Sequence, residues 1–125
     1  DVRPFLAESN ILVLPSYREG MPRTVLEAAS MGRPAIVSDV PGCRSSVLPG
    51  AAGWLCEAGS LDPLEQHMQA CLEMPREALE AAGLASRERI EREFDQAIVV
   101  RAYLGCMQHT LAPEIGRGRG AMSPA

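Results

Sequence analysis

The sequence predicts an α/β fold in which helices cover both faces of a mostly parallel sheet. Two short and continuously apolar runs, at 11–14 and 35–38, have the form of strands buried on both faces. A helical pattern joins them, so strand, helix and strand follow one another within about 28 residues, the size of a right-handed βαβ unit. The run G-W-L-C-E at 53–57 predicts a third, weaker strand. Three strands are few for such a layer, so the sheet is expected to be partial, with its missing strands before Asp1.

The composition is that of a globular chain. With 125 residues it is one domain or part of one, and 46% apolar residues are enough to form a core. A net charge of −4 argues against a nucleic-acid partner, since no basic stripe is present to meet phosphates. No window approaches the roughly 18 consecutive apolar residues of a membrane span. An integral membrane protein is therefore not expected, while docking on a membrane surface stays open.

The first half of the chain is expected to alternate helix and strand. Residues 1–10 have helical spacing without a cap or a preceding strand, as expected for a segment cut from a longer chain. After the strand at 11–14, a loop leads to a helix with Pro22 as its first residue, where the missing N–H costs no hydrogen bond. This helix is expected to end at Met31–Gly32. Its apolar residues should cover the sheet: Val25, Leu26, Ala28 and Ala29.

The second half is expected to be helical after a turn-rich loop at 39–50. Asp62-Pro63-Leu64-Glu65 has the form of a capping box at a helix start. Pro75 interrupts that helix, and a second one follows over 77–91. Asp95 is expected to cap a last helix. We expect the ordered domain to span residues 1–112, and residues 113–125, which lack periodicity and bulk, to form a disordered tail.

The four cysteines predict free thiols. They lie at positions 43, 56, 71 and 106 without a C-x-x-C pair, and neither histidine lies near one at zinc-ligand spacing. Cys71 and Cys106 fall on apolar faces of predicted helices, so both are expected to be buried. Unpaired cysteines are typical of a reducing, cytoplasmic compartment. No metal ion is expected.

The loop after the first strand can hold a phosphorylated ligand. Ligands of open parallel sheets bind at the carboxyl ends of the strands, so segments 16–23 and 38–44, which follow neighbouring strands, should face one crevice. At the start of the helix the free amides of Arg23 and Thr24 suit a phosphate. Gly20 lets a ligand approach the backbone closely.

Two carboxylates bracket this helix start, Glu19 in the loop and Glu27 in the helix, with seven residues between them. A carboxylate can accept hydrogen bonds from the two vicinal hydroxyls of a ribose, a role that fits Glu27. Glu19 is placed for a second hydroxylated group beyond the phosphates. A diphosphate between two sugars is a nucleotide sugar. Either glutamate taken singly is equally well explained as part of a solvated surface.

The segment L-P-S-Y-R-E-G-M-P-R-T-V-L-E-A-A-S-M-G-R-P-A-I-V-S-D-V-P-G-C-R resembles the donor-binding segment of retaining glycosyltransferases of family 4, which have the GT-B fold. The resemblance covers roughly the first 110 residues and is specific in this segment, while the helical half is generic. The closest branch has the pattern D-V-P-G-C-R-E. This chain has Ser45 in place of the glutamate, so no function is assigned to that position. Arg44 fits a loop-stabilising salt bridge as well as a substrate contact.

The resemblance implies a role for each matching residue. Glu19 corresponds to the glutamate that contacts the transferred sugar near the reaction centre, and Glu27 to the one that binds the ribose hydroxyls. The backbone of Gly20 and Met21 would approach the donor sugar. The amides of Arg23 and Thr24 would lie near the diphosphate.

The resemblance also implies what the full-length protein does. It would be a Rossmann-like GT-B enzyme that moves a hexose or N-acetylamino sugar, with retention, from a UDP-linked donor to a glycan or lipid-linked acceptor. Such transfer serves the synthesis of bacterial surface polysaccharide and lipopolysaccharide. The resemblance implies a protein in the cytoplasm or at the inner face of the cytoplasmic membrane. No cofactor or metal is implied beyond the nucleotide-sugar donor. The sheet edge left open by truncation invites a dimer.

The acceptor site and a basic Arg/Lys pair that neutralises the leaving diphosphate lie, in this family, before the segment present here. The chain alone is therefore expected to be inactive, because negative charge develops on the leaving group. Two other hypotheses for the function of the chain stay open. One is a non-catalytic nucleotide-sugar-binding module, and the other is a flavodoxin-like interaction domain that binds no nucleotide. A dinucleotide dehydrogenase is set aside, since G-x-G-x-x-G follows none of the strands.

Overall fold

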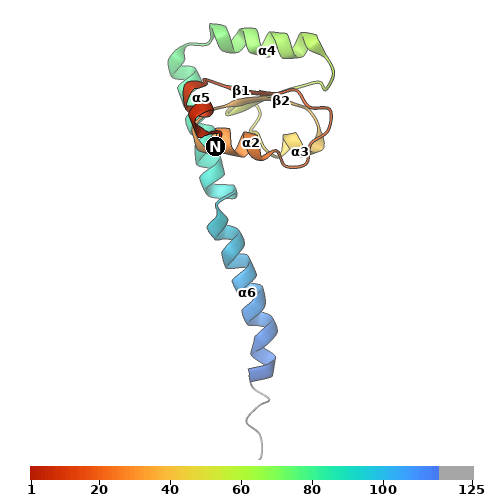
Figure 1. Cartoon of the computed structure of the whole chain (residues 1–125), viewed down its shortest axis with the longest axis vertical. Coiled ribbons are helices and arrows are strands. Elements are labelled where there is room, and N and C mark those ends of the chain that lie inside the picture. Colours follow the sequence, from red (N-terminus) through yellow and green to blue (C-terminus); the bar gives the residue numbers. More distant parts are fainter. Residues whose placement is uncertain (116–125) are drawn as a thin grey trace, which may run out of the picture. The chain divides into compact units, whose positions relative to one another are not determined.

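The computed structural model describes residues 1–115, the last five of them as backbone. The chain divides into two compact units, Asp1–Arg92 and a second that begins at Glu93 (Figure 1). The first unit contains the sheet and five helices, and the described part of the second contains one helix. In chain order the elements are α1 (Arg3–Glu8), β1 (Leu12–Leu14), α2 (Arg23–Ser30), β2 (Ala35–Ser38), α3 (Pro41–Arg44), β3 (Gly53–Cys56), α4 (Leu61–Glu73), α5 (Arg76–Glu93) and α6 (Gln96–Ile115).

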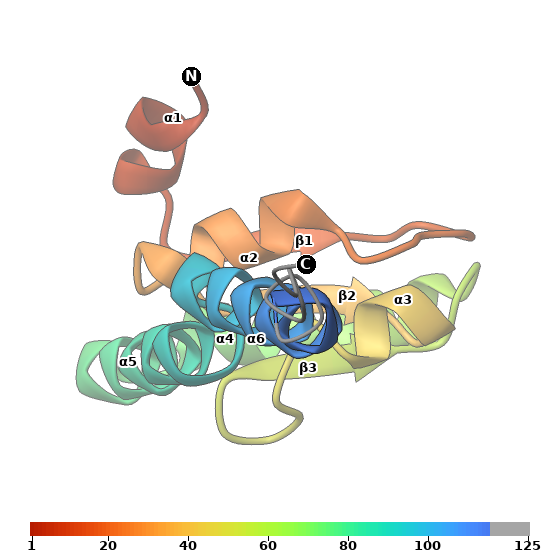
Figure 2. The ribbon, with the colours of Figure 1, turned by 90° about the horizontal axis from the view of Figure 1, so that it is seen from below.

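The three predicted strands form one parallel sheet in the order β1-β2-β3 (Figure 2). Val13 pairs with Ile36, and Ile36 in turn pairs with Trp54. The predicted α/β class and the βαβ unit are confirmed. Among residues 1–115, β1 has β2 as its only partner strand, so its outer edge is unpaired.

Alternate residues of each strand face opposite layers of helix. On one face, Ala35 and Val37 of β2 form a buried cluster with Val25 of α2 and Cys43 of α3. On the other face, Ile36 packs with Cys71 of α4. Figure 1 shows α4 on one side of the sheet, and α2 and α3 on the other. This two-sided burial explains why the strands read as unbroken apolar runs.

The starts of the later helices test two predicted caps. The capping box at Asp62 is wrong, because α4 begins at Leu61, two residues before the predicted first residue Pro63, with Ser60 as its N-cap in an extended conformation. Asp62 thus lies inside the first turn, where its negative charge is favourable next to the positive end of the helix dipole. The cap at Asp95 is confirmed: its Oδ1 accepts a hydrogen bond from the amide of Ala97 at 2.8 Å.

The loop predicted for 39–50 contains a short helix, α3, with Pro41 in its first turn. The prediction missed it because four helical residues are too few to show a periodic pattern.

The last helix, α6, runs three residues beyond the predicted end at position 112. The fixed φ of a proline such as Pro113 is compatible with helical backbone, although its ring removes one hydrogen bond. The remainder of the predicted tail, 116–125, lies outside the described residues. Within residues 1–115, no helix is both long and apolar enough to cross a membrane.

Three of the four cysteines are buried, at 43, 56 and 71, whereas Cys106 is exposed. The predicted burial is confirmed for Cys71 and wrong for Cys106. The apolar stripe of α6 that suggested it is itself exposed, with Tyr103 at 69% and Met107 at 56%. An apolar periodic pattern shows which side chains share a helix face, but does not show that another element covers that face.

Helix α5 meets the turn between α2 and β2 at a contact between two glycines. A Cβ atom at Gly83 would overlap the carbonyl oxygen of Gly32. Gly32 itself has a positive φ of 69°.

Gly83→Ala should therefore lower the free energy of unfolding by about 1–3 kcal/mol, the usual cost of overpacking. Urea titration followed by far-UV circular dichroism measures it. Gly105→Ala in α6 is the matched control, since its Cβ meets no atom within 4 Å. A Gly83→Ala chain as stable as the wild type would contradict the contact.

Candidate functional site

The segment between β1 and α2 differs from the prediction by one residue. Pro22 is the N-cap of α2 rather than its first residue, with an extended ψ of 107°. Its carbonyl oxygen accepts hydrogen bonds from the amides of Val25 at 3.1 Å and Leu26 at 3.4 Å. The amides of Arg23 and Thr24 precede the first of these bonds, as expected at a helix start. Both side chains are exposed, so the helix start is accessible to a ligand.

Glu19 lies in the exposed part of this loop and has a partner that the sequence analysis missed. The hydroxyl of Ser16 donates a hydrogen bond to Glu19 Oε1 at 2.9 Å. This bond orients the carboxylate relative to the end of β1. The spacing of three residues allows this bond but does not predict it, so the sequence carried no signal for it.

Glu27 lies one turn along α2 from Arg23, and its side chain is 43% exposed. The Arg23 guanidinium lies 4.0 Å from Glu27 Oε1. This separation is too long for a hydrogen bond, so the carboxylate oxygens can accept bonds from a ligand. Glu27 borders an open groove of about 400 Å³, together with Ser30, Met31 and the first residues of the chain, Asp1, Val2 and Arg3.

Gly20 and Met21 lie at the tip of the loop. A Cβ atom at Gly20 would meet no protein atom within 4 Å, so the space above this residue is open. Met21 is 44% exposed, and its sulfur lies 3.9 Å from the hydroxyl of Ser45. The predicted access of a ligand to this backbone is thus sterically possible.

The second predicted segment, 38–44, meets the first one directly. A Cβ atom at Gly42 would overlap the carbonyl oxygens of Glu19 and Gly20. Figure 2 shows α3 at the end of the sheet where the loop after β1 turns back toward α2. The prediction that the two segments lie together at the carboxyl ends of the strands is confirmed. The sequence analysis missed Gly42, for which the dipeptide P-G signalled only a turn.

The charges near α3 are paired within the chain. Arg44 donates a hydrogen bond to Asp39, and this bond together with the carboxylate charge raises the pKa of Arg44. The geometry supports the loop-stabilising interpretation of Arg44. Burial raises the pKa of the Cys43 thiol, and the negative charge of Glu19 raises it further. Cys43 is therefore a protonated core residue at neutral pH.

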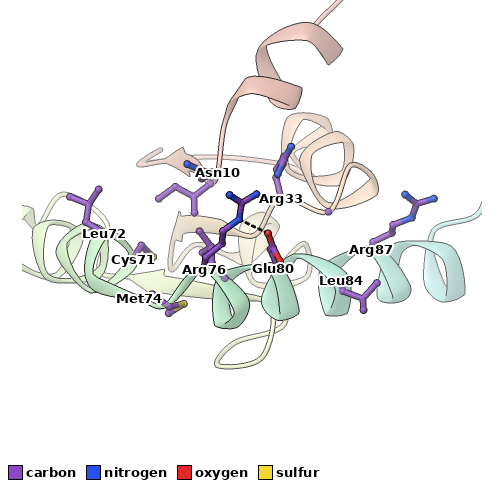
Figure 3. A pocket seen from close by; sticks show the side chains of 12 residues that line it. Asn10, Arg33, Cys71, Leu72, Met74, Arg76, Glu80, Leu84 and Arg87 are labelled. Atoms are coloured by element: carbon purple, nitrogen blue, oxygen red, sulfur yellow. Dashed lines mark hydrogen bonds and ion pairs between the residues drawn. The ribbon is translucent and has the colours of Figure 1, made fainter.

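A larger cavity of about 620 Å³ lies at the opposite end of the sheet, beside the start of β1 (Figure 3). It contains none of the predicted site residues. Its arginines have partners within the chain: Arg76 pairs with Glu80 at 2.7 Å, and Arg33 donates to the carbonyl oxygens of Leu6 and Ala7 at 3.0 and 2.8 Å. The predicted site residues therefore lie outside this cavity.

Comparisons with known proteins point to one enzyme class. The model of the family "Glycosyl transferases group 1" matches residues 1–74. A Campylobacter jejuni protein, N,N'-diacetylbacillosaminyl-diphospho-undecaprenol alpha-1,3-N-acetylgalactosaminyltransferase, is 31% identical over 104 residues. The match covers 83% of this chain but 27% of that relative. The chain thus spans about a quarter of the length of the relative.

Solved structures agree on the fold. Sucrose-phosphate synthase from Thermosynechococcus elongatus superposes with a TM-score of 0.82 at 24% identity, over 90% of this chain and 28% of that one. HepE from Anabaena, solved in complex with UDP, superposes with a TM-score of 0.78 at 18% identity, over 84% of this chain and 29% of that one. With the family model matching more than half of its residues, the chain belongs to the glycosyl transferases group 1 family and carries part of a GT-B fold.

Proposed function

We propose that the chain is the donor-binding part of a retaining glycosyltransferase of family 4. The observation that carries the proposal is the exposed start of α2 after β1, where Arg23 and Thr24 are the first helical residues and stand between Glu19 and Glu27 along the chain. A helix start suits a diphosphate, and carboxylates suit the hydroxyls of the sugars on either side of it.

Each site residue has a role in this proposal. Glu27 accepts hydrogen bonds from the ribose hydroxyls, and the amides of Arg23 and Thr24 bind the diphosphate. Glu19, oriented by Ser16, contacts the transferred sugar near the reaction centre. The backbone of Gly20 and Met21 borders the same sugar, in the open space above Gly20. These contacts bind a UDP-sugar without a metal ion.

The full-length protein would transfer a hexose or N-acetylamino sugar to a glycan or lipid-linked acceptor in bacterial surface polysaccharide synthesis. The name of the Campylobacter relative, which specifies a diphospho-undecaprenol acceptor, supports this acceptor class. A lipid-linked acceptor favours action in the cytoplasm at the inner face of the membrane, by peripheral association. The unpaired edge of β1 offers a surface for a dimer, since unpaired strand edges recruit other strands.

The 125-residue chain is expected to bind UDP saturably but to transfer no sugar. Binding needs only the α2 start and its two carboxylates, whereas transfer also needs an acceptor site and cations for the leaving diphosphate. Isothermal titration with UDP measures the first property, and release of UDP from UDP-N-acetylgalactosamine in the presence of a lipid-linked acceptor measures the second. A chain that binds no UDP would contradict the proposal and favour an interaction domain. Turnover by the chain alone would contradict its inactivity.

A further inference from the structure

The first turn of α3 supports the donor loop, by which we mean residues 16–22. A side chain at Gly42 has no room, because its first carbon would lie on the backbone carbonyl groups of Glu19 and Gly20. Backbone atoms cannot swing aside as the end of a long side chain can. Any residue larger than glycine at position 42 must therefore displace either α3 or the donor loop.

α3 itself is firmly held, so the loop is the part that would move. Cys43 is fully buried in the core cluster. The amide of Asp39, just before α3, donates to the carbonyl oxygen of Cys56 in β3 at 2.7 Å. At the other end, Arg89 of α5 donates to the carbonyl oxygen of Ser45 at 2.7 Å. The short helix is thus tied to the core, to the sheet and to α5.

The donor loop has fewer anchors of its own. The Tyr17 ring lies against Gly59 and Pro22 is buried, so the loop is anchored near both ends, whereas Arg18, Glu19 and Gly20 between them are exposed. The side-chain contacts found for Glu19 and Met21 are the hydrogen bond from Ser16 and the long hydroxyl–sulfur contact from Ser45, both at exposed positions. Between those ends, backbone contact with α3 therefore sets the position of Glu19 and Gly20.

We propose that Gly42 is a positioning residue for sugar binding: its lack of a side chain seats the Glu19–Gly20 backbone on α3 and so places the Glu19 carboxylate. The inference rests on the proposed function, in which Glu19 and its neighbours meet the transferred sugar. The nucleotide half of the donor lies along α2, at Arg23, Thr24 and Glu27, whereas the atoms nearest to a Cβ at Gly42 belong to Glu19 and Gly20. A change at Gly42 should consequently separate sugar binding from nucleotide binding.

The first test follows the loop without a ligand. In the ¹⁵N-labelled 125-residue chain, Gly42→Ala should shift the amide resonances of residues 18–21 and leave those of α4 unchanged. Gly105→Ala, a glycine with open space around it, is the control and should leave residues 18–21 unchanged. If Gly42→Ala fails to fold, nuclear Overhauser contacts in the wild-type chain between the α protons of Gly42 and the backbone of residues 19–21 decide instead, and their absence would overturn the proposal. Unchanged loop resonances in the folded variant would overturn the proposal.

The second test compares two ligands. For Gly42→Ala, the dissociation constant for UDP should stay within about twofold of the wild-type value. The dissociation constant for UDP-N-acetylgalactosamine should rise at least tenfold. An equal loss for both ligands would make Gly42 merely structural, and no loss for either would overturn the proposal. If the wild-type chain binds no UDP, the proposed function fails, and the resonances of the donor loop still decide whether Gly42 positions it.

Discussion

Replacing Glu27 with alanine is expected to weaken UDP binding by about ten- to hundredfold. In the proposed function this carboxylate accepts hydrogen bonds from the ribose hydroxyls, and a hydrogen bond to a charged group contributes about 1.5–3 kcal/mol. The side chain is 43% exposed, so its removal leaves no buried group without a partner. The fold should therefore be unaffected. Isothermal titration with UDP measures the loss.

Two variants make this result specific. Glu27→Gln keeps the shape of the side chain and one acceptor oxygen but loses the charge, so its affinity should fall between those of Glu27→Ala and the wild type. Glu65→Ala removes an exposed glutamate from α4, on the other side of the sheet, and should bind UDP like the wild type. An unchanged dissociation constant for Glu27→Ala would show that this carboxylate is part of a solvated helix face.

Replacing Ile36 with alanine is expected to cost about 2–5 kcal/mol of the free energy of unfolding, a large part of the total for a small domain. Ile36 is fully buried at the centre of β2, between Val13 of β1 and Trp54 of β3, and packs under α4. Truncation removes apolar contacts and leaves a cavity that neighbours on three elements cannot all fill. Urea unfolding followed by circular dichroism gives the difference.

The size of the truncated group should set the cost. Ile36→Val removes one methylene group and should cost about 0.5–1.5 kcal/mol. Leu72→Ala, on a side chain that is 81% exposed in α4, should change stability by less than about 0.5 kcal/mol. A cost for Ile36→Ala no greater than that for Leu72→Ala would contradict the central position of Ile36 in the core.

The expected outcomes at these two positions differ in how far the sequence predicts them. The apolar run 35–38 predicts a strand buried on both faces, and Ile36 is buried in the structure. Glu27 is identified by its spacing from Glu19 and by the resemblance to a family pattern. The groove beside Glu27 is also lined by the first residues of the chain. It therefore depends on the packing of the chain start near α2, which no local sequence pattern predicts.

The sequence by itself determined the parts of this protein that depend on neighbours along the chain. These are the strands at 12–14, 35–38 and 53–56, the βαβ unit and the cap at Asp95, because burial on both faces and capping leave local patterns. Only the tertiary structure decided where separate segments touch. It placed Gly42 against the donor loop and Gly83 against Gly32, and left Cys106 exposed. The sequence of a glycine is the same whether it serves a turn or makes room for another segment. A periodic apolar stripe likewise has the same sequence whether or not another element covers it. Residues distant in the chain decide what lies against such a glycine or such a stripe.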